Sequence, residues 1–279
     1  MTLPTRPDAA GIDRLREVLR SRERLLVAFS GGVDSGLLAF VANGVLGPDR
    51  ALAVTAVSTS LAPSERADCR RLAHRWGMRW IEVATAEGSR PEYVANGIDR
   101  CYHCKSELME KLLPVAEDEN AAIALGVNLD DLQDHRPGQA AASERGAVFP
   151  LVEAGLGKQA VREAARLLGL DIWDKPAAAC LASRVPYGTA VTFSTLNQVA
   201  SAEEALKRLG FRELRVRHYG DLARIELGGP EDLARAAGAD RDAVIAAVKD
   251  AGYRYVTLDL EGLRSGNLNP GVLDGGARA

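Results

Sequence analysis

The segment Ser30–Ser35, with the sequence Ser-Gly-Gly-Val-Asp-Ser, constrains the fold of this chain more than any other feature. It lies between two apolar runs, Leu25–Phe29 and Gly36–Val41, an order that predicts a buried strand, a tight glycine turn and the start of a helix. Two glycines let the backbone turn sharply and approach an anion closely, since no Cβ is in the way. The free N–H groups of the first helical turn, together with the helix dipole, favour negative charge. The segment therefore predicts a phosphate site.

Five residues of this segment are candidate nucleotide ligands, namely Ser30, Gly31, Gly32, Asp34 and Ser35. The two serines add hydroxyl donors. The carboxylate of Asp34 would repel a phosphate unless a cation lay between them, so we expect Asp34 to bind Mg²⁺. The segment lacks the lysine of a Walker A loop and does not follow the G-x-G-x-x-G spacing. An ordinary glycine turn is the alternative.

Composition favours a globular protein over a protein that coats nucleic acid and over a membrane-spanning protein. The 279 residues fit one large or two modest domains, and the net charge of −3 argues against a protein that coats nucleic acid. No apolar run is long enough to cross a membrane, and the start of the chain lacks the apolar core of a signal peptide. We therefore expect a cytoplasmic protein whose cysteines are reduced or metal-bound.

Strand and helix patterns alternate through the first part of the chain. Apolar strand patterns lie at residues 25–29, 51–57, 81–83 and 121–125, and helical patterns lie at residues 8–21, 63–76, 91–116 and 158–168. This alternation predicts an α/β fold with a doubly wound parallel sheet, in which ligands bind beyond the carboxyl ends of the strands. The glycine turn and the turn Asn128–Asp131 both follow strands, so we expect them to share one pocket. Asp130 and Asp131 are therefore candidate ATP ligands, with a solvated acidic turn as the alternative.

The pattern changes near Trp173. Residues 174–188 are rich in Ala, Pro and Gly and have no clear period, which is typical of a linker or an active-site loop. Beyond them we expect a helix at residues 195–209 capped by Ser194, strands at 213–218, 222–227 and 253–258, and a helix at 241–249. The sequence therefore predicts two domains, residues 1–172 with the parallel sheet and residues 173–279 as a smaller C-terminal α+β domain.

Four cysteines occur in the chain, and we expect three of them to be functional. Cys69 lies inside a helical pattern and is interpreted as a buried apolar residue. Cys101 and Cys104 form a C-x-x-C pair, which can clamp a metal or act as a redox dithiol. Cys180 lies in a loop near basic residues, which favours a nucleophilic thiolate; a small apolar loop residue is the alternative.

Cys101, Cys104 and Cys180 are enough ligands for a metal centre. Three thiolates can hold a 4Fe–4S cluster and leave one iron open to a ligand such as sulfide. A zinc site completed by His74 or His103 is the alternative. On a helix, His103 would face away from the two cysteines that flank it, which makes it a poor fourth ligand.

Several segments carry a resemblance to known enzymes. Ser30–Ser35 matches the S-G-G-x-D-S loop, called the PP-loop, of the ATP pyrophosphatases, which transfer AMP to a substrate oxygen and release pyrophosphate. Together with this loop, residues 100–105, 179–184, 214–218, 223–226 and 262–267 resemble the LarE family, so the resemblance covers most of the chain. It implies the PP-loop (adenine nucleotide alpha hydrolase-like) type of α/β fold for residues 1–172. It also implies a substrate and sulfur-transfer domain at residues 173–279.

The resemblance implies an ATP-dependent sulfurtransferase in the assembly of the nickel-pincer nucleotide of lactate racemase. The substrate would be a small molecule, pyridinium-3,5-biscarboxylic acid mononucleotide, whose carboxylates are adenylated and converted to thiocarboxylates. Some members of the family sacrifice the sulfur of one cysteine at the position of Cys180, and others bind a 4Fe–4S cluster through three cysteines. Since Cys101 and Cys104 accompany Cys180, we favour the cluster, with Cys180 as a sacrificial donor as the alternative. A homo-oligomer, either a trimer or a hexamer, is also implied.

Four residues are candidates for binding the substrate phosphate. Ser183 and Arg184 resemble family residues near the adenylate or the substrate phosphate. Arg215 and Arg217 alternate along a predicted strand, so their guanidiniums face the same way and suit a bidentate grip on a phosphate. A solvated strand face is the alternative for this pair.

Two other functions stay open. A tRNA thiolase or a queuosine-type enzyme shares the PP-loop but needs a basic RNA-binding surface, and an aromatic content of 5% provides few rings to stack on bases. We therefore expect no nucleic-acid partner. The other function is a non-enzymatic nucleotide sensor with a zinc clamp, which would show no ATP turnover.

Overall fold

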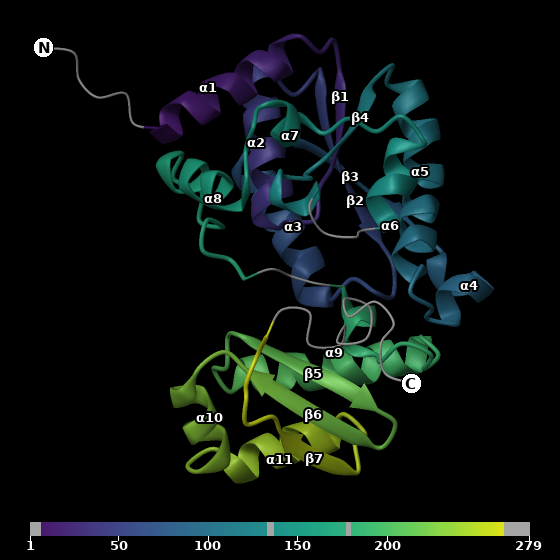
Figure 1. Ribbon diagram of the computed structural model, residues 1–279, viewed down its shortest axis with the longest axis vertical. Coiled ribbons are helices and arrows are strands. Elements are labelled where there is room, and N and C mark those ends of the chain that lie inside the picture. The colour runs from purple at the N-terminus through teal and green to yellow at the C-terminus, as the bar shows by residue number, and fades with distance from the viewer. Residues whose placement is uncertain (1–6, 133–136, 177–179, 265–279) are drawn as a thin grey trace, which may run out of the picture. The chain divides into compact units, whose positions relative to one another are not determined.

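The computed structural model describes residues 7–132, 137–176 and 180–264. Its contacts group the chain into two compact units, which are described separately (Figure 1). The first unit comprises residues 1–58, 63–87 and 101–178, and the second comprises residues 59–62, 88–100 and 179–279. Residues 59–62 and 88–100 thus belong to the second unit, although the sequence predicts them in the first domain. Local periodicity does not reveal the long-range contacts that group them with the second unit. The division of roles between residues 1–172 and 173–279 stays a prediction.

The first unit contains a four-stranded parallel sheet with the strand order β3-β2-β1-β4. Its strands are β1 (Leu25–Ala28), β2 (Ala51–Val57), β3 (Arg79–Ala84) and β4 (Ala122–Leu125). β1 pairs with both β2 and β4, so Leu25 is level with Ala51 on one side and with Ala122 on the other. The predicted parallel α/β sheet is confirmed and is consistent with a Rossmann-like fold, and the finer PP-loop type stays a prediction.

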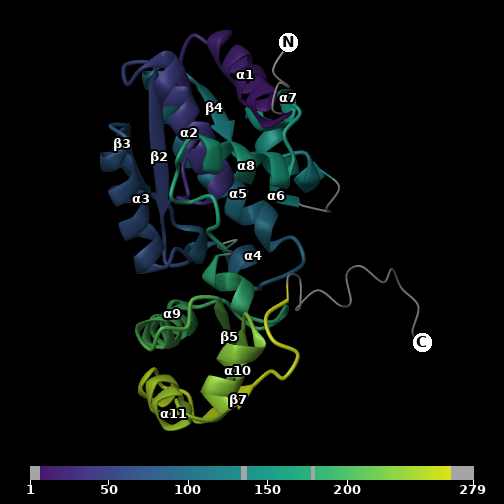
Figure 2. The same ribbon diagram turned by 90° about the vertical axis from the view of Figure 1, so that its left-hand side faces the viewer.

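Helices cover both faces of this sheet (Figures 1 and 2). One face packs against α1 (Pro7–Arg20), α2 (Val33–Leu46), α3 (Pro63–Arg75), α7 (Pro150–Glu153) and α8 (Lys158–Leu167). The other face packs against α5 (Arg100–Asp118) and α6 (Pro137–Ser143). Because successive strand side chains point to opposite faces, β1 contributes Leu25 and Val27 to one core and Leu26 to the other. Within the described residues, no helix combines the length and the apolar character needed to cross a membrane.

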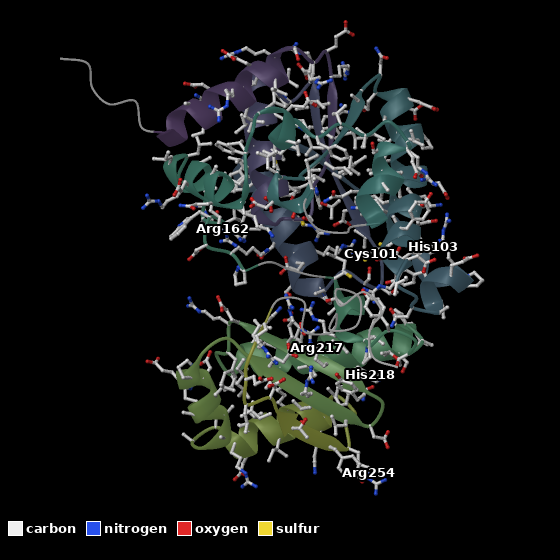
Figure 3. The ribbon with its side chains drawn as sticks, in the orientation of Figure 1. Cys101, His103, Arg162, Arg217, His218 and Arg254 are labelled. Atoms are coloured by element: carbon white, nitrogen blue, oxygen red, sulfur yellow. The ribbon has the colours of Figure 1, made fainter. Side chains whose placement is uncertain are left out.

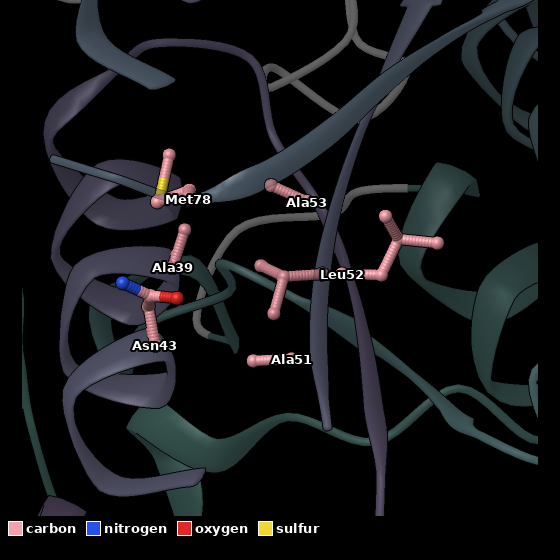
Figure 4. Close-up of a pocket in the computed structure, with 7 residues that line it drawn as sticks. Ala39, Asn43, Ala51, Leu52, Ala53 and Met78 are labelled. Carbon is pink, nitrogen blue, oxygen red and sulfur yellow. The ribbon is translucent and has the colours of Figure 1, made fainter. Parts of the chain in front are cut away.

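Small side chains bring α2 close to β2 (Figure 4). Ala39 on α2 and Ala51 and Ala53 on β2 line a narrow gap between the two elements. The side-chain amide of Asn43 donates to the carbonyl oxygen of Trp76 at 3.3 Å, which ties α2 to the end of α3. These contacts fix the axis of the helix whose first turn follows the glycine segment.

The helix expected at residues 91–116 is wrong in one respect, because two helices occupy this range. They are α4 (Pro91–Val94) and α5, which begins at Arg100. Asn96, between them, has a φ of 56°, a left-handed conformation that cannot continue a right-handed helix. The apolar periodicity continues on both sides of this break, so the sequence pattern does not reveal it.

The second unit contains a three-stranded sheet with the order β5-β6-β7. β5 (Leu214–Tyr219) is antiparallel to β6 (Leu222–Leu227), and β7 (Tyr255–Leu258) is parallel to β6. Its core includes residues of the sheet and of α9 (Phe193–Arg208), α10 (Pro230–Ala237) and α11 (Arg241–Asp250). The predicted cap of α9 is wrong, because Thr192 rather than Ser194 accepts the hydrogen bond, at 3.1 Å from the backbone nitrogen of Thr195.

We predict that Gly126→Ala destabilises the first unit. Gly126 follows β4, and a Cβ built there lies 2.7 Å from the backbone nitrogen of Ser35, at the start of α2. Because backbone atoms cannot move aside, we expect a loss of about 1–3 kcal/mol in the free energy of unfolding, measured by denaturant titration. Gly44→Ala is the control, since Gly44 lies within α2 with open space around it and should gain up to about 1 kcal/mol. Equal stability of the two variants would contradict this account of the β4–α2 contact.

Candidate functional site

The glycine segment forms the strand, turn and helix that its sequence predicts. It joins the carboxyl end of β1 to α2, and no side chain caps the first turn of α2 at Gly32. Gly31 has a φ of 71°, and a Cβ there would lie 3.0 Å from the Sγ of Cys69, so this position favours glycine on two counts. The hydroxyls of Ser30 and Ser35 lie 3.0 Å apart. The turn therefore presents backbone N–H groups and hydroxyls at a helix N-terminus, an arrangement suited to phosphate.

Asp34 joins this turn to the segment that follows β4. The side-chain amide of the fully buried Asn128 donates to Oδ1 of Asp34 at 2.8 Å. Burial raises the pKa of Asp34, and the neighbouring carboxylate of Asp131 raises it further, against the hydrogen bond from Asn128. Because its charge is poorly compensated by the protein, Asp34 has the electrostatic surroundings that a bound cation would relieve.

Asp130 and Asp131 both take part in local structure. Asp130 accepts a hydrogen bond from the backbone nitrogen of Lys158, at the start of α8. The buried Asp131 accepts from the backbone nitrogen of Asn128 at 3.2 Å, and the side chain of Asn128 accepts from the backbone nitrogen of Asp131 at the same distance. The structure thus places Asp131 near Asp34 and Asp130 at the start of α8, both in the first unit, and their role as ATP ligands stays a prediction.

Lys175 supports the glycine turn, a role that the sequence patterns did not reveal. Its ammonium group donates to the carbonyl oxygen of Gly31 at 3.3 Å, to Glu65 at 2.7 Å and to Asp68 at 3.0 Å. Burial alone would lower the pKa of Lys175, but the two carboxylates outweigh it and the pKa is raised. These contacts span more than a hundred residues of sequence, so no local signal could have found them.

The four cysteines have different environments. Cys69 is fully buried, as predicted, and burial raises the pKa of its thiol to about 11, so it is an inert packing residue. Cys101 and Cys180 are exposed, Cys104 is half-buried, and none of the three forms a disulfide. Cys101, labelled in Figure 3, and Cys104 lie on α5 in the first unit, and Cys180 lies in the second unit. In the part of the chain that the structure describes, no three His, Cys, Asp or Glu side chains are grouped to hold a metal ion.

Buried carboxylates neutralise two of the three predicted phosphate-binding arginines. Arg184 forms a bidentate pair with Glu203, with N–O distances of 2.8 and 3.1 Å. Arg217, on β5 (Figure 3), donates to Glu226 at 2.8 and 3.0 Å. Glu203 lies on α9 and Glu226 on β6, so local sequence patterns do not reveal that they pair with these arginines.

Arg215 differs from these two arginines. It is half-buried, and within the described residues its side chain donates no hydrogen bond to a carboxylate. Burial lowers the pKa of Arg215, and the neighbouring Arg184 and Arg217 lower it further. A partly desolvated guanidinium beside two others favours an anion. Ser183 contacts the neighbouring Arg217, since its carbonyl oxygen accepts a hydrogen bond from the Arg217 side chain at 2.9 Å.

The fold and the glycine turn define the class: an α/β protein with a parallel sheet and a glycine turn at a helix N-terminus. Three curated proteins are similar over nearly the whole chain. An uncharacterised protein of Synechocystis is 46% identical over 260 residues, 92% of this chain and 96% of that protein. Pyridinium-3,5-bisthiocarboxylic acid mononucleotide synthase of Lactiplantibacillus plantarum is 39% identical over 253 residues, 90% of this chain and 91% of the synthase.

An uncharacterised protein of Methanocaldococcus jannaschii is 26% identical over 254 residues, 91% of this chain and 95% of that protein. No family model matches the chain. The identity to the synthase and the coverage of both chains show that this chain belongs to the LarE family, the family of that synthase.

We predict that Asp34→Asn raises the melting temperature at neutral pH. A raised pKa means that the folded state holds the proton of Asp34 more strongly than the unfolded chain does. Ionisation therefore costs stability as the pH rises from the unfolded pKa through the raised folded pKa, and the cost is complete above it. Asparagine has no charge to bury and can still accept from Asn128.

The measurement is the melting temperature against pH in the presence of a chelator. The gain over wild type should shrink as the pH falls through this window. Asp221→Asn, at an exposed turn of the second unit, is the control for removal of a carboxylate outside the buried site. A variant at Asp34 that is less stable than wild type at pH 7 would contradict this interpretation of its burial.

Proposed function

We propose that this chain is an ATP-dependent sulfurtransferase that converts the carboxylates of pyridinium-3,5-biscarboxylic acid mononucleotide to thiocarboxylates, for the nickel-pincer cofactor of lactate racemase. The observation that carries the proposal is the 39% identity, over 90% of the chain, to a protein named for the bisthiocarboxylic product. The strand, glycine turn and helix with Asp34 support the ATP-dependent part. A cytoplasmic homo-oligomer, either a trimer or a hexamer, belongs to the same proposal.

The first step activates a carboxylate. A carboxylate oxygen of the substrate attacks the α-phosphorus of ATP, the bond to the β-phosphate oxygen breaks, and an acyl-adenylate and pyrophosphate are formed. The N–H groups at the start of α2 and the hydroxyls of Ser30 and Ser35 would hold the leaving phosphates. Asp34 would hold Mg²⁺, which supplies positive charge to those phosphates. Asp130 and Asp131 are proposed to complete the nucleotide site.

The second step exchanges oxygen for sulfur. In the single-cysteine route, the Cys180 thiolate attacks the acyl carbon and AMP leaves with the carboxyl oxygen, so that a thioester forms. Loss of the Cα proton of Cys180 to a base then breaks its Cβ–S bond. The products are the thiocarboxylate and dehydroalanine at position 180. The exposure of Cys180 permits this attack.

The cluster route, which we favour, uses Cys101, Cys104 and Cys180 as ligands of a 4Fe–4S cluster. The thiols fit this group in kind, since none of the three forms a disulfide and the first two lie about one helical turn apart on α5. When bound, the cluster supplies a sulfide that displaces AMP from the acyl carbon. The route requires the thiols of both units to be brought together, so metal content is its direct test.

The phosphate of the substrate is proposed to bind at Arg215, together with Arg217, Ser183 and Arg184. Arg215 carries this assignment because its charge is not neutralised by a hydrogen-bonded carboxylate. The paired Arg217 and Arg184 would surround the anion without leaving an excess of buried positive charge when it departs.

The proposed activity predicts formation of AMP and pyrophosphate from ATP that depends on the pyridinium substrate. The measurement is nucleotide chromatography, with the thiocarboxylate product detected by its mass. Asp34→Asn should abolish both products because it removes the proposed Mg²⁺ ligand. ATP that stays intact in the presence of substrate, or AMP formation that responds to tRNA instead, would refute the proposal.

The sulfur source is decided by anaerobic purification with iron and sulfide analysis. The cluster route predicts bound iron and sulfide that are lost in Cys101→Ser and Cys104→Ser, and loss of product in both variants. Metal-free protein that makes product while Cys180 loses the mass of hydrogen sulfide would eliminate the cluster route and support the single-cysteine route.

We predict that Arg215→Ala raises the KM for the pyridinium mononucleotide about tenfold to a hundredfold, the loss expected for a hydrogen bond between charged groups. The KM for ATP should not change, because the nucleotide turn belongs to the first unit. Arg215→Lys should lie between wild type and alanine. Arg254→Ala, which removes an exposed arginine of the same unit (Figure 3), is the control and should bind substrate normally. An unchanged KM for Arg215→Ala would remove Arg215 from the phosphate site.

A further inference from the structure

The segment that follows Cys180 is held by a fully buried asparagine, Asn96. The side-chain nitrogen Nδ2 of Asn96 donates to the carbonyl oxygens of Pro186 and Thr189 at 2.8 Å, and it lies 3.4 Å from the carbonyl oxygen of Val185. In return, the backbone nitrogen of Gly188 donates to the carbonyl oxygen of Asn96 at 3.1 Å. One residue thus fixes the path of residues 185–189.

Arg100 extends this clamp towards Cys180. It is 5% exposed, and its Nη1 donates to Oδ1 of Asn96 at 2.6 Å and to the carbonyl oxygen of Ala182 at 2.8 Å. Its guanidinium lies 5.7 Å from the centre of the Tyr187 ring, on the same segment. Ala182 lies in η3 (Leu181–Arg184), the short 3₁₀ turn that begins directly after Cys180.

Other contacts restrain η3 as well. Arg184 donates to the carbonyl oxygen of Cys180 at 3.2 Å, and Arg217 donates to that of Ser183 at 2.9 Å. The backbone nitrogen of Leu181 donates to the carbonyl oxygen of Ser60 at 3.0 Å. All of these residues belong to the second unit. The backbone around Cys180 is therefore held at successive residues while its side chain stays exposed.

The clamp is costly to break. Asn96 uses both its amide donors and its side-chain acceptor, so its loss would remove a hydrogen bond from buried carbonyl groups and one from the buried guanidinium of Arg100. Asn96 also holds a φ of 56°, a conformation that most residues adopt only with strain. The contacts of Asn96 and Arg100 converge on the segment that carries Cys180, whereas the apolar core of the second unit lies among residues 202–253.

We propose that Asn96 and Arg100 are positioning residues for the Cys180 thiol in sulfur transfer, an inference that rests on the proposed function. They hold the backbone of η3, so that the sulfur has one position, whether it attacks the activated carboxyl carbon or binds iron. A misplacement of about 1 Å at a reacting group can cost a hundredfold in rate. The nucleotide residues proposed above belong to the first unit, and the ratio of thiocarboxylate to AMP does not depend on how much substrate is activated, so loss of the clamp should lower this ratio by uncoupling the two steps.

The test is the ratio of thiocarboxylate to AMP formed by the full-length protein. Asn96→Gly removes the side chain and keeps the backbone conformation accessible, and Arg100→Met removes the donors. Both should form AMP with an unchanged KM for ATP, and the ratio should fall about tenfold to a hundredfold. Arg100→Lys should recover part of the loss, because it can still donate to Ala182.

Asn120→Gly is the matched control, since Asn120 also has a positive φ, of 48°, but is exposed in the first unit. Its ratio should equal that of wild type. A wild-type ratio in Asn96→Gly and Arg100→Met would overturn this inference alone. So would an equal fall in AMP and thiocarboxylate accompanied by a lower melting temperature, which would assign the clamp to stability. Wild-type protein that forms no thiocarboxylate would instead overturn the proposed function.

Discussion

The pairing of β1 with β2 on one side and β4 on the other is the constraint on which the first unit depends. Because β1 is central and parallel to both neighbours, the turn after β1 and the turn after β4 leave the sheet at the same edge. Gly126 lets the backbone after β4 approach the start of α2, and Asn128 then reaches Asp34. The geometry of the predicted anion site is thus a consequence of strand order, and the glycine turn completes it.

At this predicted site, the requirements of folding stability and those of ligand binding oppose each other. Gly31 adopts a conformation that other residues rarely take, and Asp34 is held where burial disfavours its charge. Other buried charges are compensated by ion pairs. Lys175 pairs with two carboxylates, Arg184 pairs with Glu203, and Arg217 pairs with Glu226. Asp34 and Arg215 are left with less compensation. A bound ligand of opposite charge would compensate the buried charge of each residue, so we expect ligands at these two positions.

The sequence predicted elements whose signal is local, and missed those that depend on distant contacts. β2 and β6 have the expected bounds, because their apolar periods end in clear turns. The break at Asn96 was missed because the neighbouring helical patterns share one period. The glycine turn was predicted from six adjacent residues, whereas the contact of Lys175 with Gly31 joins residues 144 positions apart. Likewise, the strand pattern gave Arg215 and Arg217 the same face but could not show that the buried Glu226 accepts from Arg217 and Arg224.

How the Cys180 segment is restrained matters for the chemistry of its sulfur. In the described hydrogen bonds, the carbonyl oxygens around Cys180 accept from arginines, and the thiol itself stays exposed. A restraint placed on Sγ would have to be broken whenever the sulfur forms a bond to carbon or to iron. A restraint placed on the backbone survives either event, because the peptide groups keep their partners while the sulfur changes its own. Fixing the main chain and leaving the side chain free therefore suits a thiol that must react in place.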